Sequence, residues 1–378
     1  MDKISLDYLI LGPAYPFRGG ISDTQHELAL ALEKDGKEVE LVTFTKLYPK
    51  LIFPGKTQFS NQLKPEALNI TQQIHAYNPL LWPKVVKYIC SKSPKVVVFR
   101  YYTPFLAFAY TWIAKNLPKS IKKVAIIDNW IPHEPSWFDK KLNLFFLKYL
   151  DSISCLSQFV ARQIRNDFKG PVWGGFHPIN SNLLPIINQK KARIKLNWET
   201  EVSYVLFFGL IRSYKGLELL IRAFNETPLV DKKIKLYVAG ECYEDQNKYN
   251  KIVKSLNLEK RIILDFEFKN TADIQKIFSA SDIVAQTYHN ATQSGITPLA
   301  YHYQKPLLVS DIEGLKAPII LDQTGLIVKK ESKSIAEGIC EILDKKNHNK
   351  FSKNIKKIST KYNWSSFSKQ WDNFVSEV

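Results

Sequence analysis

The amino-acid sequence predicts an α/β protein with two doubly wound domains, each built on a parallel sheet. Apolar runs of the β type alternate with helical patterns along the whole chain, which is typical of parallel sheets. The length of 378 residues exceeds what one such domain usually contains. The alternation restarts after a polar, irregular stretch at 183–202. We therefore expect an amino-terminal domain at 1–182, a linker at 183–202 and a carboxyl-terminal domain at 203–361.

The strands of the first domain are predicted from short apolar runs. Several are apolar on both faces, as in sheets covered by helices. The first run is followed by a loop rich in Gly and Pro and by a helix near 22–35. The predicted strands span residues 7–12, 38–44, 95–101, 123–129 and 152–157.

The second domain repeats this architecture without repeating the sequence. At the end of the chain, Trp364, Phe367, Trp371 and Phe374 recur at helical spacing. We therefore expect an amphipathic helix at 362–378, with its aromatic side chains packed on a surface. The predicted strands of this domain span residues 205–210, 235–240, 261–266, 282–288 and 306–311.

Charge and cysteine content limit the partners and the compartment. The formal net charge of +17 is spread over both domains and favours anionic partners. No helix-turn-helix, zinc-finger or RNA-binding signature is present, so we do not expect a nucleic-acid partner. The 4 cysteines lie in apolar stretches without a CxxC pair, as in a reducing compartment. With no signal-peptide pattern and no long apolar run, we expect a cytoplasmic protein.

The most informative segment follows the first strand of the second domain. The apolar run ends at Gly209, Arg212 and Lys215 come next, and Gly216 opens an amphipathic helix. Free amide groups at a helix N-terminus attract anions, and Arg and Lys add charge-assisted contacts. The arrangement favours a diphosphate ligand. The alternative is an ordinary loop with two solvated cations.

A second loop of the same domain has a related composition. It contains Thr292, Gln293, Ser294 and Gly295, and a helix begins at Ile296. Backbone amides and small polar side chains at this helix start predict a second contact site for an anion.

Polar residues in the amino-terminal domain also follow predicted strands. Gly19 and Gly20 lie in the first loop and allow close approach of a ligand, although a plain turn would also contain them. Asp128 ends the fourth strand, and His133 and Glu134 follow. Asp128 and His133 are candidates for orienting a hydroxyl or acting as a base. Alternatively, Asp128 caps a loop and His133 pairs with Glu134.

Several catalytic motifs are missing from the sequence. There is no DxD for a metal–diphosphate bridge and no His/Cys/Asp cluster for zinc. There is also no GxxxxGK[ST] loop, no GxSxG elbow and no GxGxxG fingerprint. We therefore expect no metal site and no bound cofactor.

The motifs also resemble a known family when they are taken in order along the chain. They are GPAYPFRGGI, NPLLWP, DNWIPHE, FHP, FFGLIRSYKGL, VAGE, SDIVAQTY, ATQSGITPLAYHYQKPLLVSDIEGL and TGLIV. This set resembles the retaining glycosyltransferases of family 4, which have the GT-B fold of two Rossmann-like domains facing across a cleft. The resemblance covers essentially the whole chain and is most specific at FGLIRSYKG.

The resemblance implies roles for residues of both domains. Arg212 and Lys215 match the family's pair that neutralises the diphosphate of a nucleoside-diphosphate sugar, and Gly240 matches the glycine beside the nucleotide. Gly19 and Gly20 would lie near the donor phosphates, in a domain that receives the acceptor. The terminal helix would cross back to that domain.

Two positions depart from the family pattern. The family's Glu-x7-Glu pair falls on Ala291 and Leu299, and Gln293 is a candidate to substitute for the first carboxylate. The strand-tip residue that is often His in the family is Asp128, whereas His133 matches a PHE-type pattern of relatives.

The resemblance implies retaining, metal-independent transfer of a sugar to a hydroxyl of a glycan or polyprenyl-linked glycan, in surface polysaccharide or glycoconjugate biosynthesis. The leaving diphosphate would itself help to deprotonate the acceptor. The basic, aromatic segment 104–123 suggests peripheral attachment to an anionic membrane surface at its inner face. An ordinary buried helix with a solvated basic end is the alternative. Competing hypotheses for the protein are a non-catalytic nucleotide-sugar-binding protein and a GT-B epimerase or hydrolase.

Overall fold

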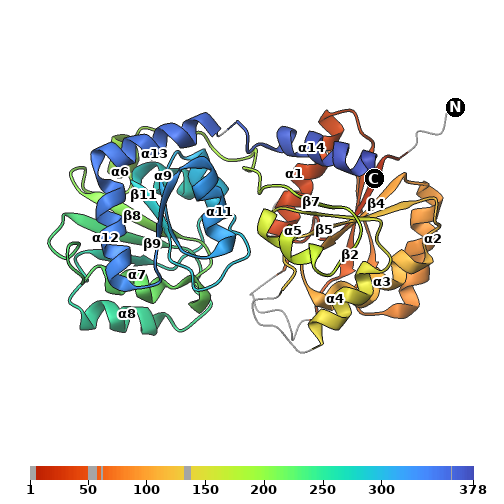
Figure 1. Ribbon diagram of the computed structural model, residues 1–378, viewed down its shortest axis with the longest axis horizontal. Coiled ribbons are helices and arrows are strands. Elements are labelled where there is room, and N and C mark those ends of the chain that lie inside the picture. The colour runs from red at the N-terminus through yellow and green to blue at the C-terminus, as the bar shows by residue number, and fades with distance from the viewer. Residues whose placement is uncertain (1–5, 50–57, 61–62, 132–137, 359) are drawn as a thin grey trace. The chain divides into compact units, whose positions relative to one another are not determined.

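The computed structural model describes residues 6–49, 58–60, 63–131, 138–358 and 360–378. The chain forms two compact units (Figure 1). The first contains Met1–Pro178 together with Asn363–Val378, and the second contains Ile179–Tyr362. In the described ranges, no helix is both long enough and apolar enough to cross a membrane.

The first unit has a seven-stranded parallel sheet in the order β3-β2-β1-β4-β5-β6-β7. Sequence analysis did not predict β3 and β7. The β3 strand lies at an edge and alternates buried with partly exposed positions, so its sequence ITQQIH is not an apolar run. The strands are β1 (Tyr8–Leu11), β2 (Val39–Lys46), β3 (Ile70–His75), β4 (Val96–Tyr101), β5 (Lys122–Ile127), β6 (Ser152–Cys155) and β7 (Val172–Gly174).

Helices cover both faces of this sheet. On one face, α1 packs beside α14, the last helix of the chain, and on the other α3 packs against α2 and α4. Short 3-10 turns, η1 (Pro79–Leu81) and η2 (Pro104–Leu106), lead into α2 and α3. The helices are α1 (Gly20–Lys34), α2 (Trp82–Lys92), α3 (Ala107–Asn116), α4 (Asp139–Leu147), α5 (Gln158–Arg165) and α14 (Trp364–Glu377).

The terminal helix α14 is an integral part of the first unit. The fully buried Trp371 donates from Nε1 to Ser154 Oγ at 2.9 Å. The hydroxyl of Tyr8 donates to Asp372 at 2.5 Å. The core on this face therefore combines strands from the start of the chain with aromatic residues from its last segment.

The second unit has a six-stranded parallel sheet in the order β10-β9-β8-β11-β12-β13. Its strands are β8 (Ser203–Phe208), β9 (Ile234–Ala239), β10 (Ile262–Asp265), β11 (Ile283–Gln286), β12 (Leu307–Ser310) and β13 (Gly325–Val328). Its helices are α6 (Gln189–Lys195), α7 (Leu217–Ala223), α8 (Gln246–Ser255), α9 (Thr271–Ala280), α10 (Ile296–His302), α11 (Glu313–Asp322), α12 (Ser332–Leu343) and α13 (Lys345–Ile358).

The polar stretch at 183–202 contains α6 and lies within the second unit. The buried Arg193 of α6 donates to Asp282 at 2.7 Å and to the carbonyl oxygen of Ala280 at 3.0 Å. These contacts fix the stretch to the sheet.

The strand order reverses between β1 and β4 in the first unit and between β8 and β11 in the second. Both sheets are doubly wound and parallel, which confirms the predicted fold class. In such sheets, ligands bind beyond the carboxyl ends of the strands at the reversal point. The loops after β1, β4, β8 and β11 are therefore the places to look for function.

Candidate functional site

The loop after β8 has a backbone that depends on glycine at two positions. Gly209 and Gly216 have positive φ angles of 103° and 62°. A Cβ atom on Gly216 would lie 2.1 Å from the carbonyl oxygen of Thr287, so no other residue fits without moving the neighbouring loop. Between them, Ser213–Lys215 forms the 3-10 turn η3, which leads into α7.

Lys215 is the buried cation of this loop. Lys215 is 7% exposed. Its Nζ lies 3.0 Å from the point that a Cβ atom on Gly209 would occupy. The ammonium group also lies 5.4 Å from the ring centroid of Tyr288, a cation–π distance. Burial lowers the pKa of Lys215, and the charge of the nearby Tyr214 opposes this effect.

No carboxylate forms an ion pair with Lys215 in the part of the chain that the structure describes. Its ammonium group is therefore desolvated without a matching negative charge. Binding of an anion beside this group would offset the cost of its desolvation.

Arg212 immediately precedes η3 and is exposed. Its neighbour Ser213 is held in place, because its N–H donates to the carboxylate of Glu244 in the loop after β9. Glu244 also accepts from the hydroxyl of Tyr249 at 2.9 Å. The backbone at Arg212 is thus anchored, while its guanidinium reaches solvent.

The loop after β11 lies beside the β8 loop. His289 donates its N–H to the carbonyl oxygen of Tyr214 at 2.7 Å. The side chain of Ile296 approaches the Cβ position of Gly209 at 3.2 Å. The structure thus brings Gly209, Lys215 and Ile296 together at the reversal point of the sheet.

The other predicted residues of the β11 loop have more varied environments. Thr292 is buried, Gln293 is half-buried and Gly295 is exposed. Ser294 Oγ accepts from the N–H of Ile296 at 3.2 Å. Ser294 therefore caps one amide at the start of α10. That amide is not available to the anion that the sequence analysis expected to bind here.

Gly240 closes the neighbouring strand end. It has φ 134°, and a Cβ atom there would lie 2.3 Å from the carbonyl oxygen of Gly209. Glycine at 240 is thus required for the close approach of two strand ends. This packing role places Gly240 directly beside the loop that carries Lys215.

In the first unit, the loop between β1 and α1 contains Gly19 and Gly20. Gly19 has φ 114°, and a Cβ on either residue would meet nothing within 4 Å. The loop is anchored upstream, where Ala14 N–H donates to Thr43 Oγ at 2.9 Å and Tyr15 N–H donates to His26 Nε2 at 3.0 Å. The glycines themselves are left open.

Asp128 lies directly after β5 and binds the buried Arg100 of β4. Arg100 Nε donates to Oδ2 at 2.7 Å and Nη2 donates to Oδ1 at 2.6 Å. Arg100 Nη2 also donates to Thr24 Oγ1 at 3.1 Å. This two-point ion pair orients Arg100. His133 lies outside the described residues.

His177 belongs to the FHP motif, but the sequence analysis did not name it as a site residue. Its Nδ1 donates to the carbonyl oxygen of Pro178 at 3.1 Å, which leaves Nε2 as an acceptor. Burial lowers the pKa of His177, while the Pro178 contact and the charge of Asp128 oppose this effect. His177 follows β7 (Val172–Gly174), and because this strand of 3 residues has no signal in the sequence, a histidine at its end has none either.

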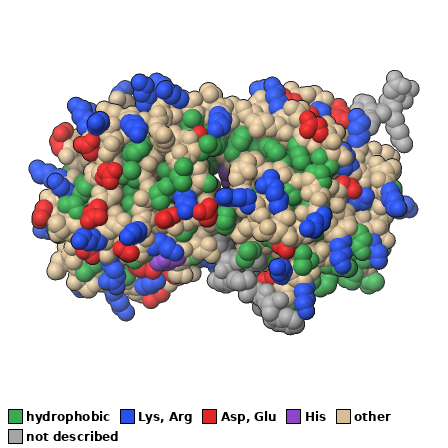
Figure 2. Space-filling view, viewed as in Figure 1, with side chains coloured by type: hydrophobic (Ala, Val, Ile, Leu, Met, Phe, Trp, Pro, Cys, Tyr) green, Lys and Arg blue, Asp and Glu red, His purple; other side chains and the backbone are tan. Residues whose placement is uncertain are grey.

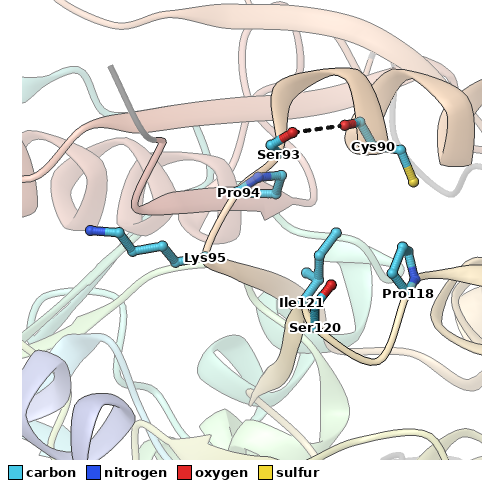
Figure 3. Close-up of a pocket in the computed structure, with 7 residues that line it drawn as sticks. All are labelled: Cys90, Ser93, Pro94, Lys95, Pro118, Ser120 and Ile121. Carbon is cyan, nitrogen blue, oxygen red and sulfur yellow. Dashed lines mark hydrogen bonds between the residues drawn. The ribbon is translucent and has the colours of Figure 1, made fainter. Parts of the chain in front are cut away.

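A separate hollow lies at the opposite end of the first sheet's strands, near the amino ends of β4 and β5 (Figure 3). It is lined by Cys90, Ser93, Pro94, Lys95, Pro118, Ser120 and Ile121. Lys95 pairs with Asp7 at 2.7 Å. Because ligand sites of such sheets lie at the carboxyl ends of the strands, this hollow is not part of the candidate site.

Most of the second unit matches a known protein family. Residues 188–358 match the family model described as Glycosyl transferases group 1. D-inositol 3-phosphate glycosyltransferase of Corynebacterium aurimucosum is 24% identical over 161 residues, which are 41% of this chain and 38% of that protein. The match therefore spans less than half of that relative's length.

Solved structures resemble the chain over nearly its whole length. Sucrose-phosphate synthase of Thermosynechococcus elongatus superimposes with a TM-score of 0.78 at 16% identity, covering 98% of each chain. Anabaena HepE in complex with UDP gives a TM-score of 0.73 at 17% identity, covering 98% of this chain and 100% of that one. The chain therefore has the GT-B fold of two Rossmann-like domains, and its second unit is similar in sequence to the group 1 glycosyl transferases.

Proposed function

We propose that this protein is a retaining glycosyltransferase of family 4. It transfers a sugar from a nucleoside-diphosphate sugar to a hydroxyl of a glycan or polyprenyl-linked glycan. The observation that carries the proposal is the buried ammonium group of Lys215, which lies at the reversal point of the second sheet without a carboxylate partner among the described residues. A diphosphate supplies the missing negative charge. The match to group 1 glycosyl transferases over residues 188–358 supports the same assignment.

The donor class is supported by what similar structures contain. HepE was solved with UDP and with UDP-glucose, and Arabidopsis starch synthase IV was solved with ADP and acarbose. We propose that Lys215 and Arg212 bind the diphosphate, that Gly209, Gly240 and the 292–296 loop form the adjoining wall, and that Gly19 and Gly20 approach the donor phosphates.

In the proposed mechanism, the diphosphate leaves from the same face on which the acceptor attacks. Cations at the leaving group stabilise the developing charge, which is often the largest catalytic contribution. The leaving phosphate oxygen takes the acceptor proton, so no protein nucleophile is required. We propose that no divalent metal takes part, because Lys215 and Arg212 supply positive charge where a DxD-bound cation would act.

The ion pair with Arg100 favours a positioning role for Asp128 over that of a general base. We further propose that the enzyme is cytoplasmic and acts at the inner face of a membrane, in surface polysaccharide or glycoconjugate biosynthesis.

A direct test measures sugar transfer from a panel of nucleoside-diphosphate sugars to lipid-linked and soluble glycans, with and without EDTA. We expect a product that keeps the anomeric configuration of the donor and a rate unchanged by EDTA. Loss of turnover in EDTA, restored by Mg²⁺ or Mn²⁺, would contradict the metal-free mechanism. Release of free sugar or an epimerised donor without acceptor would instead support a hydrolase or an epimerase.

A second candidate is a nucleotide-sugar-binding protein without transfer activity. It is favoured by the apolar residues Ala291 and Leu299 at the positions of the Glu pair. Tight binding of a donor with no product from any acceptor, including crude lipid extracts, would support this candidate.

A further inference from the structure

The first unit contains an open pocket that none of the proposed donor contacts use. It has a volume of about 630 Å³, which is within the range of small-molecule sites. Its walls come from the residues that follow β3 and β4 and from the start of α4. It therefore lies at the carboxyl ends of the strands, where α/β proteins bind ligands.

The lining of this pocket is aromatic and aliphatic. It consists of Ala76, Tyr77, Trp82, Thr103, Pro104, Phe105, Phe108, Phe138, Asp139 and Leu142. Phe108 is 60% exposed and Phe138 is 45% exposed. Large apolar side chains that remain exposed around a hollow are a common mark of a binding surface.

Two polar groups of the lining are already used inside the protein. Trp82 Nε1 donates to the carbonyl oxygen of His75 at 2.9 Å. Thr103 Oγ1 accepts from the N–H of Phe105 at 3.4 Å. A sugar ring needs several hydrogen-bond partners, whereas a hydrocarbon chain needs none. The hydroxyl of Tyr77 and the carboxylate of Asp139 are the other polar side-chain groups of the lining, and the remaining side chains are apolar. The lining as a whole therefore suits an apolar chain better than a sugar.

The helices around the pocket are basic. Near the starts of α2 and α4, Lys84, Lys140 and Lys141 are exposed, and Asp139 is the acidic residue there. Lys140 lies 3.6 Å from the carboxylate of Asp167. Lys84 follows the lining residue Trp82 by two positions, and Lys140 and Lys141 directly follow Asp139. Blue and green side chains lie together over these helices in Figure 2. The occupant should therefore combine an apolar chain with an anionic head.

We propose that this pocket binds the isoprenoid chain of a polyprenyl-diphosphate-linked acceptor, with Phe108 and Phe138 in contact with the chain and the nearby lysines facing the diphosphate. This inference rests on the proposed function and assigns a lipid-binding site to the acceptor side. An isoprenoid fits because its branched, unsaturated units pack against aromatic rings, and the diphosphate matches the surrounding positive charge.

The test uses farnesyl diphosphate as the probe, at concentrations below those at which it forms micelles, and measures its affinity by calorimetry. Inorganic diphosphate is the control ligand. The variants are Phe108→Asp on α3 and Phe138→Asp at the start of α4. Phe145→Asp on α4 is the matched control, since Phe145 is also 45% exposed but does not line the pocket. All three variants change the charge equally.

We expect wild type to bind farnesyl diphosphate more tightly than inorganic diphosphate. We expect Phe108→Asp and Phe138→Asp to weaken farnesyl diphosphate binding by about tenfold or more, as loss of an aromatic contact predicts, with Phe145→Asp near wild type. Equal losses in all three variants would show a general effect of charge and would overturn the proposal. So would equal affinity for the two diphosphates.

Binding of UDP, GDP and ADP is measured in parallel by thermal shift. If a nucleotide binds but farnesyl diphosphate does not, the pocket assignment fails and the proposed function stands. If farnesyl diphosphate binds as expected but no nucleotide does, the lipid site stands and the donor assignment fails. Sedimentation with phosphatidylglycerol vesicles tests for binding of acyl lipids. If wild type sediments with the vesicles, Phe108→Asp does not, and neither binds farnesyl diphosphate, the pocket binds acyl lipids and the isoprenoid proposal is overturned.

Discussion

The two units each bury a cation near the reversal point of their sheet, but the two cations have different surroundings. In the first unit, the guanidinium of Arg100 is 1% exposed and binds both oxygens of Asp128. In the second unit, Lys215 is nearly as buried, yet no carboxylate pairs with it in the described residues.

This difference separates a structural cation from one prepared for a ligand. A buried ion pair is neutral and satisfied, so removing one partner leaves an uncompensated charge. A buried cation without a partner is already destabilising, and an arriving anion relieves that cost. The comparison therefore predicts opposite outcomes for similar substitutions in the two units.

The largest expected effect on stability is that of Asp128→Ala. We expect it to destabilise the first unit by about 3–5 kcal/mol, because it leaves Arg100 buried and unpaired. Urea unfolding followed by circular dichroism measures this change. Replacing both partners, as in Arg100→Met with Asp128→Leu, should restore most of the stability. If the double variant is stable but inactive, the Arg100–Asp128 pair is needed for turnover as well as for stability.

The next effect is that of Lys215→Met on activity. We expect turnover to fall about hundred- to thousand-fold, the cost of removing one electrostatic donor from a transition state. Stability should stay the same or rise, since the substitution removes a desolvated charge. Steady-state kinetics and thermal unfolding on the same preparation measure both. Lower stability with normal turnover would reverse the comparison.

A smaller effect is expected for Arg212→Gln. The side chain is exposed, so water screens its charge, and a hydrogen bond to a charged group contributes about 1.5–3 kcal/mol. We expect a loss of roughly ten- to a hundred-fold in kcat/KM for the donor. Arg222→Gln, on a helix of the same unit, is the control. A loss larger than that of Lys215→Met would shift the main contact to the exposed cation.

The smallest effect concerns pH. Burial lowers the pKa of Lys215 in the folded protein, so between this lowered pKa and the ordinary lysine value the unfolded chain binds more protons. Stability of the free protein should therefore rise with pH in that window. Binding of a diphosphate should restore the proton and should weaken as pH rises through the lowered pKa. Calorimetry in two buffers of different ionisation enthalpy measures proton uptake, which should disappear in Lys215→Met.

Local sequence was enough to predict the fold class and the loop that contains Lys215. Buried strands of this fold are continuous apolar runs, and a strand that ends in Gly, followed by cations and a helix, is visible within a dozen residues. The edge strands β3 and β7 of the first sheet gave no such signal, because β3 is partly exposed and β7 has 3 residues. The edge strand β10 of the second sheet is apolar enough to have been predicted.

The environment of Asp128 could not be predicted from sequence in the same way. Its partner Arg100 lies 28 positions earlier, and the two meet only because β4 and β5 pair in a register that joins Tyr101 to Ile127. The pocket of the first unit likewise needs the ends of β3 and β4 and the start of α4 in one place. Contacts of this kind depend on which strands are neighbours, which local patterns do not specify.

The position of α14 in the first unit has a consequence for how the protein is made. The ribosome synthesises the strands of the first unit early, but Trp371 and its neighbours follow only after the whole of Ile179–Tyr362. At about 5–20 residues per second, this delay lasts on the order of ten seconds or more. During that time, one apolar face of the first sheet lacks its last helix, while the second unit can already fold. A nascent chain arrested before residue 363 should therefore be cut by protease within the first unit and protected within the second. Equal protection of both units would show that the first sheet is stable without α14.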